Sequence, residues 1–525
     1  MKRYSKLIPQ GTRDLLFEEC DDRRNVESIL SALFKEYNYR KVMTPTVEFF
    51  DVFSENDLGI EAEEMYKLSD SLGRTTVLRP DNTAPIARLV ATRLSKEDFP
   101  VKLYYNQNVY VRNKSLAGRA DETEQSGIEV ISMAYEALKR NNVASFKLEL
   151  CHAGFFKSIL NKMDITATQK ADICKLIEGK NYAALGDMLA KFPDSKEADV
   201  IKKLPRLFGD VSVINEAKKL YNDEKSNEAL DYLRSVYEKL CDMGLGDNIT
   251  IDLGLVNRSN YYTGVIFRGY AEGSGLTIVS GGRYDNLLGE FGLDAPAIGF
   301  GVNVNALCDV MREEINVDRP IRIALTKGRL EKSSISLFQK MGLDTTELQN
   351  KGRRLILPVG DFEAVLSKAP DVITYVEHGV CDIGVVGKDT IVEHGNSFYE
   401  VIDLNIGKCR FALACPKGTD FFSGYRRKVV ASKYPKVAKA YFQSKGMDVD
   451  IIKIEGSVEL APLLGLADGI VDIVETGSTL KENGLEVVDT IMPISARVIV
   501  NMASMKLRKK EIEEFLNDLE LASKV

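Results

Sequence analysis

A charged stretch that ends in proline, residues 312–320, divides the sequence into two parts with different patterns. After it, Ile321 begins a strand-like run, and strand, loop and helix signals alternate to about residue 490. This alternation predicts an α/β fold for the second part. The strand-like runs are expected at 321–325, 382–387, 410–415, 450–456 and 469–477, and an amphipathic helix with Ile512, Phe515, Leu516 and Leu519 in register follows them.

The first part has a different character. Val26, Ile29, Leu30, Leu33 and Phe34 have helical spacing and predict a helix at about 17–36. Strand-like and helical runs then alternate to about residue 155. A segment rich in Lys, Asp, Leu and Ala follows, and Gly-rich strand signals return at 249–304. We therefore predict a first domain at 1–315 with a helical insertion at about 160–245, a linker at 316–320 and a second domain at 321–525.

Composition excludes several classes of protein. The 525 residues are 44% hydrophobic and 28% charged, which is typical of globular chains rather than disordered ones. The formal charge of −7 gives no support to nucleic acid as the main ligand, and we expect no nucleic-acid partner. No run of about 18 apolar residues occurs and the start shows no apolar signal segment, so we expect no membrane association.

The spacing of the cysteines and histidines gives no support to a zinc site or a disulfide framework. The eight cysteines form no CxxC pair, and we expect buried thiols in a reducing cytoplasm. The three histidines, His152, His378 and His394, have no metal-ligand spacing, so no zinc site is predicted. A Ser-His-Asp triad is equally unsupported.

The strongest local motif is the run of residues 469–480, in which an apolar strand leads into a loop of small and hydroxylated residues. The loop offers backbone N–H groups and hydroxyls to an anion, and a helix start adds its positive end. Two carboxylates just upstream could accept hydrogen bonds from ribose hydroxyls or help to place a divalent metal. The motif fits a ribose-5-phosphate group, although a helix N-cap with a turn explains it equally well. The residues are Asp472, Glu475, Thr476, Gly477, Ser478 and Thr479.

Two further groups of cations follow strand signals. Lys327 and Arg329 lie between a strand and a helix, where they could neutralise a pyrophosphate or could simply be exposed at a domain edge. Arg353 and Arg354 are adjacent on an expected strand, so at most one of them faces any given cleft.

Residues 321–505 resemble the short form of ATP phosphoribosyltransferase. The resemblance is carried by IALTKGRL, TYVEHGVCDIGVVGKD, IGKCRFALACP and EGSVELAPLLGLADGIVDIVETGSTLKENGL. It implies two α/β lobes with a cleft, similar to a periplasmic binding protein, with crossovers near Cys409–Arg410 and near residue 490.

The implied reaction transfers 5-phosphoribosyl from phosphoribosyl pyrophosphate to N1 of ATP and releases pyrophosphate, the first step of histidine biosynthesis. The implied cofactor is Mg²⁺, with no firmly assigned metal ligand, and no protein nucleophile is required. We predict Thr476, Gly477, Ser478 and Thr479 on the 5-phosphate, Asp472 and Glu475 on the ribose hydroxyls, Lys327 and Arg329 on pyrophosphate or ATP phosphates, and Arg354 and Lys388 on the ATP side.

Residues 5–310 resemble the catalytic core of class II aminoacyl-tRNA synthetases of the histidyl type. The matching segments are IPQGTRDLL, VMTPTVEFFDVF, VLRPDNTAPIARLV, EQSGIEVIS, NYYTGVIFRGY, SGGRYDNLLGEFG and APAIGFGVNVNAL. The implied fold is an antiparallel sheet flanked by helices. The family's amino-acid pocket maps onto Asp81, Thr83, Gln125, Gly127, Glu129, Tyr261 and Tyr262, although a polar core inherited from an ancestor is the alternative.

The cationic residues with which the synthetases bind ATP have no counterparts at the matching positions of this sequence. Asn257 replaces the activating arginine, and Asn305-Ala306 replaces a Glu-Arg pair. Tyr110-Val111 falls where Phe-Arg is expected, with Arg112 one residue further on. Without these cations adenylate formation lacks phosphate stabilisation. The resemblance therefore implies the regulatory subunit of the short-form transferase, which has lost aminoacylation.

Together the two resemblances imply a fusion of regulatory and catalytic subunits, natural or engineered, in which L-histidine acts as effector on the transferase. The separate subunits assemble as four plus four, so a homotetramer is expected. The alternatives are a noncatalytic histidine- or nucleotide-binding regulatory protein and a histidyl-tRNA synthetase-like ligase.

Overall fold

The computed structural model describes two compact units. It describes residues 7–9, 11–54, 60–112, 122–128, 131–178, 181–256, 261–272, 274, 276–312, 319–395, 397–424 and 426–524, with only the backbone at Ser54, at 122–128 and at Ala183. Unit 1 is Met1–Asp318 together with Met502–Leu507, and unit 2 is Arg319–Asn501 together with Arg508–Val525.

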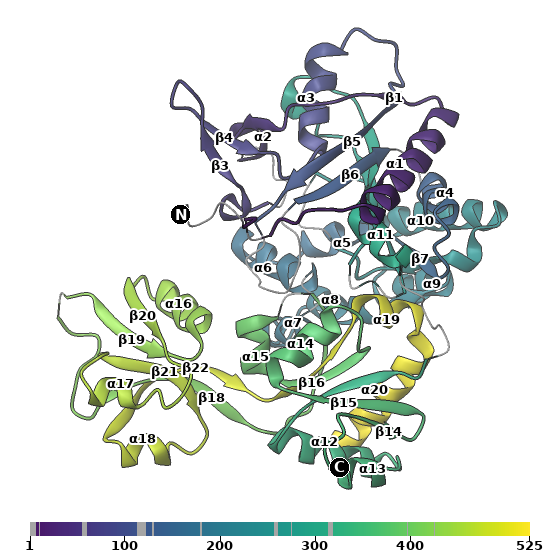
Figure 1. Cartoon of the computed structure of the whole chain (residues 1–525). Helices are drawn as coiled ribbons and strands as arrows, with labels where there is room; N and C mark the ends of the chain where they lie inside the picture. Colours follow the sequence, from purple (N-terminus) through teal and green to yellow (C-terminus); the bar gives the residue numbers. More distant parts are fainter. Residues whose placement is uncertain are drawn as a thin grey trace. The chain divides into compact units, whose positions relative to one another are not determined.

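Unit 1 is built on a nine-stranded sheet (Figure 1) with the order β1-β5-β6-β12-β11-β10-β7-β9-β8. Neighbouring strands are antiparallel except for the β1/β5 and β7/β9 pairs. This is the antiparallel sheet that the sequence predicted. The strands are β1 (Arg40–Lys41), β5 (Leu103–Tyr110), β6 (Glu122–Ile128), β7 (Phe146–His152), β8 (Phe208–Gly209), β9 (Ile249–Asp252), β10 (Val265–Ala271), β11 (Val279–Tyr284) and β12 (Ala297–Asn303).

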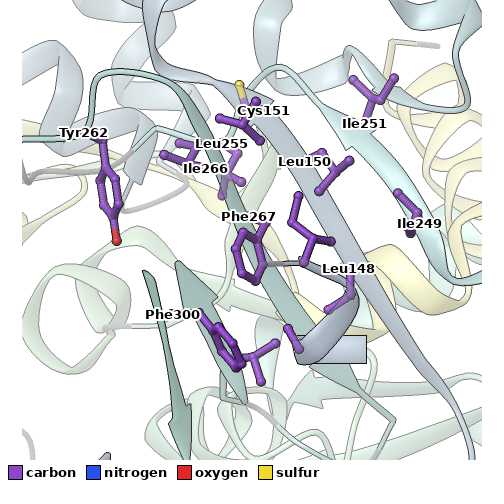
Figure 2. Close-up of a cluster of buried hydrophobic side chains, with 14 of the residues drawn as sticks. Leu148, Leu150, Cys151, Ile249, Ile251, Leu255, Tyr262, Ile266, Phe267 and Phe300 are labelled. Atoms are coloured by element: carbon purple, nitrogen blue, oxygen red, sulfur yellow. The ribbon is translucent and has the colours of Figure 1, made fainter. Parts of the chain in front are cut away.

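Helices cover this sheet because the apolar face of each helix packs against the apolar side chains of the strands. In α1 (Glu18–Glu36) the predicted residues Val26, Leu30, Leu33 and Phe34 are buried. They join one large core with side chains of β7, β9 and β10, and Figure 2 shows part of it. The other helices of this part are α4 (Ile131–Arg140), α5 (Ala153–Leu160) and α11 (Val304–Arg312).

The predicted insertion is helical apart from the two-residue strand β8 and a 3-10 turn at Leu204–Arg206. Its apolar residues, among them Ile173, Ile201 and Leu230, pack into the same core as the sheet. The helices are α6 (Ala167–Glu178), α7 (Tyr182–Leu189), α8 (Lys196–Lys203), α9 (Ser212–Leu220) and α10 (Glu224–Asp242).

A three-stranded antiparallel sheet, β2-β4-β3, forms a smaller layer with its own core. Val77 of this sheet is buried with Ala84 and Ala87 of α3 and with Leu287. The elements are β2 (Val47–Phe49), β3 (Lys67–Ser69), β4 (Thr75–Leu78), α2 (Asp51–Ser54) and α3 (Thr83–Arg93).

Unit 2 contains two lobes, each with its own sheet (Figure 1). The six-stranded sheet has the order β14-β15-β13-β16-β23-β17 and the five-stranded sheet has the order β20-β19-β21-β18-β22. Parallel and antiparallel neighbours are mixed in both. The strands are β13 (Arg322–Thr326), β14 (Ile356–Val359), β15 (Phe362–Ser367), β16 (Ile383–Gly387), β17 (Tyr399–Asp403), β18 (Cys409–Pro416), β19 (Lys428–Ser432), β20 (Val449–Lys453), β21 (Gly469–Val474), β22 (Leu485–Ile494) and β23 (Ala496–Val500).

The chain crosses between the lobes twice, once before Cys409 and once at Ser495, between β22 and β23. The two crossing segments pair with each other, because Leu404 N donates to Ala496 O and Ala496 N donates to Ile406 O. The expected two-lobed α/β architecture is confirmed. The helices are α12 (Arg329–Lys340), α13 (Thr346–Gln349), α14 (Ala369–Glu377), α15 (Lys388–His394), α16 (Pro435–Ser444), α17 (Leu460–Leu463), α18 (Ser478–Glu482) and α20 (Lys509–Lys524).

A carboxylate clasp joins the lobes beside these crossings. The buried Glu393 side chain of α15 accepts hydrogen bonds from the Lys436 and Val437 N–H groups, at 3.0 and 3.3 Å. These N–H groups begin α16 in the other lobe. A carboxylate at a helix N-terminus satisfies free donors and interacts favourably with the helix dipole.

The unit boundary departs from the predicted domains in one respect. The division after Asp318 falls within the predicted linker, and Arg319 already belongs to unit 2 because it donates to both oxygens of buried Asp382, at 2.6 and 2.9 Å. However, Met502–Leu507, which forms α19, belongs to unit 1 although it was predicted within the second domain. Its buried lysine, Lys506, explains this placement, because it contacts Glu149 and Asp252 of unit 1.

Three observations concern chemistry and location. Among the residues described, no helix is both long and apolar enough to span a bilayer. Within the same residues, no cluster of three His, Cys, Asp or Glu side chains is arranged to hold a metal ion. All eight cysteines are free thiols, but Cys20, Cys174, Cys241 and Cys409 are only half-buried, so the expectation of uniform burial was wrong.

Candidate functional site

The first group of site residues follows β13 in unit 2. Gly328 has φ of +102° at the N-terminal end of α12, a conformation that favours glycine. Its N–H donates to Glu331 Oε2 at 3.3 Å, which fixes the turn. The turn leaves Lys327 and Arg329 exposed at the carboxyl end of β13, where ligands bind in open α/β sheets.

Arg329 reaches from one lobe to the other. Its Nη1 lies 2.7 Å from Glu475 Oε2, and the two side chains are 64% and 54% exposed. The hydrogen bond to this carboxylate raises the pKa of Arg329, which keeps the guanidinium charged. Two residues that were predicted separately, one for pyrophosphate and one for ribose, are therefore in contact between the two lobes.

The hydroxyl-rich loop follows β21 directly. Gly477 has φ of +77° and precedes the short helix α18, so the loop turns back sharply after Glu475. Thr476 Oγ1 lies 3.0 Å from Ser478 Oγ, and Thr479 is exposed beside them. The loop offers three exposed hydroxyls and the backbone of a turn to a ligand.

Asp472 lies in a different environment from Glu475. It is on β21, opposite Ala412 of β18, and is half-buried. Burial raises its pKa, while the N–H of Ile473 acts in the opposite direction, and Glu459 adds to the rise. The two predicted ribose ligands thus differ, since Glu475 is exposed and paired whereas Asp472 is partly desolvated.

The structure places the two predicted ATP residues less favourably. Gly352 and Arg353 form a turn and β14 begins only at Ile356, so the expectation that Arg353 and Arg354 occupy a strand was wrong. Glycine at φ of +58° allows this turn. Arg354 is exposed and pairs with Glu347.

Lys388 is buried, and its Nζ donates to both carboxylate oxygens of Glu400 on β17, at 2.8 and 2.6 Å. The ammonium is therefore engaged within the six-stranded lobe. The roles assigned to Arg354 and Lys388 stay predictions.

Sequence reasoning missed a group at the start of α15 and α16. Tyr434 Oη donates to Asp389 Oδ2 at 3.3 Å. Burial raises the pKa of the Tyr434 phenol, and the nearby Asp389 and Asp472 carboxylates raise it further. Burial raises the pKa of the Cys409 thiol, the Asp389 carboxylate raises it further, and the Arg329 guanidinium acts in the opposite direction. The available signal was that Asp389 lies two residues after a strand end.

Unit 1 holds a cavity of about 270 Å³. Its lining includes four of the predicted pocket residues, Asp81, Thr83, Tyr261 and Tyr262. The structure adds residues that the sequence did not single out: Tyr105, Tyr284, Ser280, Gly299 and Gly301. The volume is near the lower end of ligand pockets, which run from about 300 Å³.

Three tyrosine rings form one wall of this cavity. The centroids of Tyr261 and Tyr262 are 4.4 Å apart, and Tyr284 lies edge-on to Tyr261 at 5.5 Å. Glycine is required beside them, since a Cβ on Gly282 would lie 2.8 Å from Tyr262 Cε1 and from Val265 O. The Ser-Gly-Gly-Arg-Tyr sequence was the signal that could have pointed to Tyr284.

The charge of the cavity is acidic. Burial raises the pKa of Asp81, while its hydrogen bonds from Thr83, including the 2.6 Å bond from Thr83 N to Oδ1, partly offset the rise. Among the described residues, no Lys or Arg lines the cavity. A half-buried carboxylate with aromatic walls favours a ligand that carries an ammonium group.

The remaining predicted pocket residues are described only in part. Gln125 and Gly127 lie on β6, where Gly127 pairs with Tyr105 and Gly301, both of which line the cavity. Glu129 and Asn257 lie outside the described residues. Ala306 is buried in α11, so its position presents no cation.

Comparison with known proteins assigns the two parts separately. A family profile for histidyl-tRNA synthetase matches residues 11–307, and a profile for ATP phosphoribosyltransferase matches residues 368–521. An ATP phosphoribosyltransferase regulatory subunit from Clostridium novyi is 42% identical over 334 residues, covering 60% of this chain and 79% of that protein. An ATP phosphoribosyltransferase from Clostridium kluyveri is 60% identical over 206 residues, covering 39% of this chain and 94% of that protein.

A solved structure supports the assignment of the first part. The crystal structure described as an ATP phosphoribosyltransferase regulatory subunit/histidyl-tRNA synthetase from Bacillus halodurans matches with a TM-score of 0.55 and 29% identity, covering 70% of this chain and 94% of that one. The chain therefore belongs to the histidyl-tRNA synthetase family in its first part, as a relative of ATP phosphoribosyltransferase regulatory subunits, and in its second part to the ATP phosphoribosyltransferases, which are glycosyltransferase enzymes.

Proposed function

We propose that unit 2 transfers 5-phosphoribosyl from phosphoribosyl pyrophosphate to N1 of ATP and that unit 1 senses L-histidine. The observation that carries the first half is the contact of Arg329 with Glu475 beside the Gly477 turn. It brings a cation for a leaving pyrophosphate next to a loop suited to a sugar phosphate. The matching relatives support the assignment of this place to the transferase reaction.

The reaction requires stabilisation of separating charges. As the bond from ribose C1 to pyrophosphate breaks, positive charge develops on the sugar and negative charge on the leaving group. Lys327 and Arg329 offset the negative charge, and the loop at 476–479 holds the 5-phosphate. Asp472 accepts hydrogen bonds from the ribose hydroxyls and places a carboxylate near the positive sugar. Holding both substrates in line supplies much of the rate.

Mg²⁺ fits this site as a companion of the substrate. The described residues form no cluster of three donors, and Mg²⁺ is commonly bound by one or two carboxylates plus substrate phosphates and water. Asp472 and Glu475 are the carboxylates that would hold it. Bound there, the ion would neutralise charge on the pyrophosphate.

The Asp81 cavity supports the sensing half of the proposal. The carboxylate pairs with the ammonium of histidine, and the three tyrosines enclose the imidazole ring. Thr83 and Ser280 offer hydroxyls to the histidine carboxylate. We also propose a homo-oligomer, a tetramer by analogy with separate subunits, that works in the reducing cytoplasm, where its eight free thiols persist.

The test is pyrophosphate release by the purified chain with ATP, Mg²⁺ and phosphoribosyl pyrophosphate, with and without L-histidine. Release that needs phosphoribosyl pyrophosphate and falls with histidine supports both halves. Release that histidine leaves unchanged overturns the sensor but keeps the transferase. Absence of release with tight histidine binding supports a noncatalytic regulatory protein instead.

Two controls sharpen this assay. Histidine-dependent exchange of pyrophosphate into ATP without phosphoribosyl pyrophosphate would mean a ligase, and Ala306 argues against that outcome. An Asp81→Asn variant keeps the shape of the cavity and removes its charge. We expect it to keep the transferase rate and to need at least about tenfold more histidine for inhibition.

A further inference from the structure

Lys506 is a buried cation in unit 1 that the proposed functions do not use. Its side chain is 3% exposed, and its Nζ lies 3.0 Å from Glu149 Oε1 and 2.5 Å from Asp252 Oδ2. The same ammonium lies 4.1 Å from the centre of the Phe208 ring. The neighbouring carboxylates raise the pKa of Lys506 against the effect of burial, so it stays charged.

The three partners come from adjacent strands and form a built socket. Glu149 is on β7, Asp252 ends β9 and Phe208 begins β8. The second Asp252 oxygen accepts a hydrogen bond from Gly254 N at 2.8 Å, so both oxygens of this carboxylate are engaged. The lysine belongs to α19, which is continuous in sequence with β23 on one side and α20 on the other, both in unit 2.

The socket is continuous with the Asp81 cavity along one face of the sheet. Gly301 pairs with Ser280, Ser280 pairs with Arg268, and Arg268 pairs with Glu149. Residues directly opposite in antiparallel strands lie on the same face, with Cβ atoms about 5 Å apart. Gly301 and Ser280 line the cavity, and Glu149 contacts Lys506.

Arg268 is the central member of this row. Its side chain is 14% exposed and lies 3.7 Å from Glu178. Burial lowers the pKa of Arg268, whereas Tyr270, Glu178 and Glu149 raise it, and Arg268 in turn lowers the pKa of the Tyr262 phenol, which lines the cavity. Glu149 is therefore directly opposite Arg268 of β10 and in contact with Lys506 of α19.

We propose that Arg268, Glu149 and Lys506 transmit the occupancy of the Asp81 cavity to α19, so that histidine shifts α19 between a seated and a released position and thereby controls the transferase. The inference rests on the proposed histidine-sensing function. A ligand in the cavity packs against Ser280 and Tyr262 and thereby changes the electrostatic attraction between Arg268 and Glu149. The strength of the Glu149–Lys506 pair changes in turn, and β23 and α20 receive the movement through the chain itself.

Charged side chains at Arg268, Glu149 and Lys506 suit the transmission of a signal better than they suit stability. A buried ion pair is poor evidence of stability, since apolar residues of similar size often serve the fold equally well. A shared carboxylate, however, responds to a change at either cation. Effector coupling of this kind usually changes an affinity by about 5- to 150-fold.

The experiment compares Lys506→Met with Lys510→Met, a control at an exposed lysine nearby. Pyrophosphate release is titrated with L-histidine, and histidine binding is measured by calorimetry. We expect Lys506→Met to keep the rate without histidine within about threefold and to need at least tenfold more histidine for inhibition, with Lys510→Met like the wild type. Histidine should change hydrogen exchange at residues 502–507 in the wild type and not in Lys506→Met.

The outcomes separate this inference from the function on which it rests. If histidine does not change the activity of the wild type, the proposed sensing function is wrong and this inference is wrong with it. If histidine inhibits the wild type and Lys506→Met equally, the sensor stands and the inference is overturned. If Lys506→Met does not fold, the triple variant E149Q/D252N/K506M removes the unpaired charges and is tested in its place. Lys506→Arg should restore inhibition, which a lost packing contact alone does not predict.

Discussion

Replacing Arg329 separates a catalytic cation from a surface ion pair. Arg329 and Glu475 are each more than half exposed, so their 2.7 Å contact contributes below about 1 kcal/mol to stability. In a unit of this size, Arg329→Met should lower Tm by no more than about 4 °C. Removing a donor that stabilises the charge of a transition state costs about 100- to 1000-fold in kcat. A large loss of rate with a small loss of stability is the expected pattern.

The assay is kcat/KM for phosphoribosyl pyrophosphate from pyrophosphate release, with Tm measured on the same samples. A second variant is the charge swap R329E/E475R, which keeps an ion pair between the lobes but moves the cation to the other lobe and also removes the Glu475 carboxylate proposed to bind substrate. We expect the swap to recover stability and to remain at least about 100-fold impaired. If the swap recovers activity to within threefold of the wild type, Arg329 is not a catalytic cation and the pair only holds the lobes together.

Three further predictions concern other parts of the chain. Gly299→Ala places a Cβ 3.1 Å from Tyr284 Oη, so calorimetry should show at least about tenfold weaker histidine binding with unchanged transferase rate. Burial lowers the pKa of His152 to about 4 from 6.5, and its neutral Nδ1 accepts from Gly154 N. The unfolded chain therefore binds more protons, so stability falls by about 2–3 kcal/mol as pH drops from 6.5 to 4, and His152→Asn should remove this dependence in denaturation curves. Glu393→Ala should speed hydrogen exchange at the start of α16 about fivefold, because the clasp is lost.

The spacing of apolar residues predicted helices well where buried residues recur at helical intervals. The spacing of Val26, Leu30, Leu33 and Phe34 predicted α1, and the register of Ile512 and Phe515 predicted α20. Pairing between distant strands was beyond this reasoning. Strand β23 pairs with β16 although the residues of the other lobe lie between them in the sequence. No local sequence pattern predicts such a pairing.

The candidate sites were predicted to a similar extent. Strand-then-loop motifs pointed to Arg329 and Glu475, which the structure brings together. Lys388 has a sequence context like that of Lys327, but its ammonium binds Glu400 on a strand that comes later in the chain. A charged residue after a strand signals the edge of a sheet, but its partner depends on the tertiary fold.

The placement of α19 also changes how docking depends on protein concentration. A six-residue helix with one buried cation is a weak ligand when it belongs to a separate molecule. Here the helix and its socket are parts of one polypeptide, and covalent linkage commonly gives an effective concentration in the millimolar range. An intrinsic dissociation constant as weak as about 0.1 mM would still leave the helix mostly docked. A single chain would then keep its response to histidine on dilution, whereas two separate polypeptides would lose it by mass action.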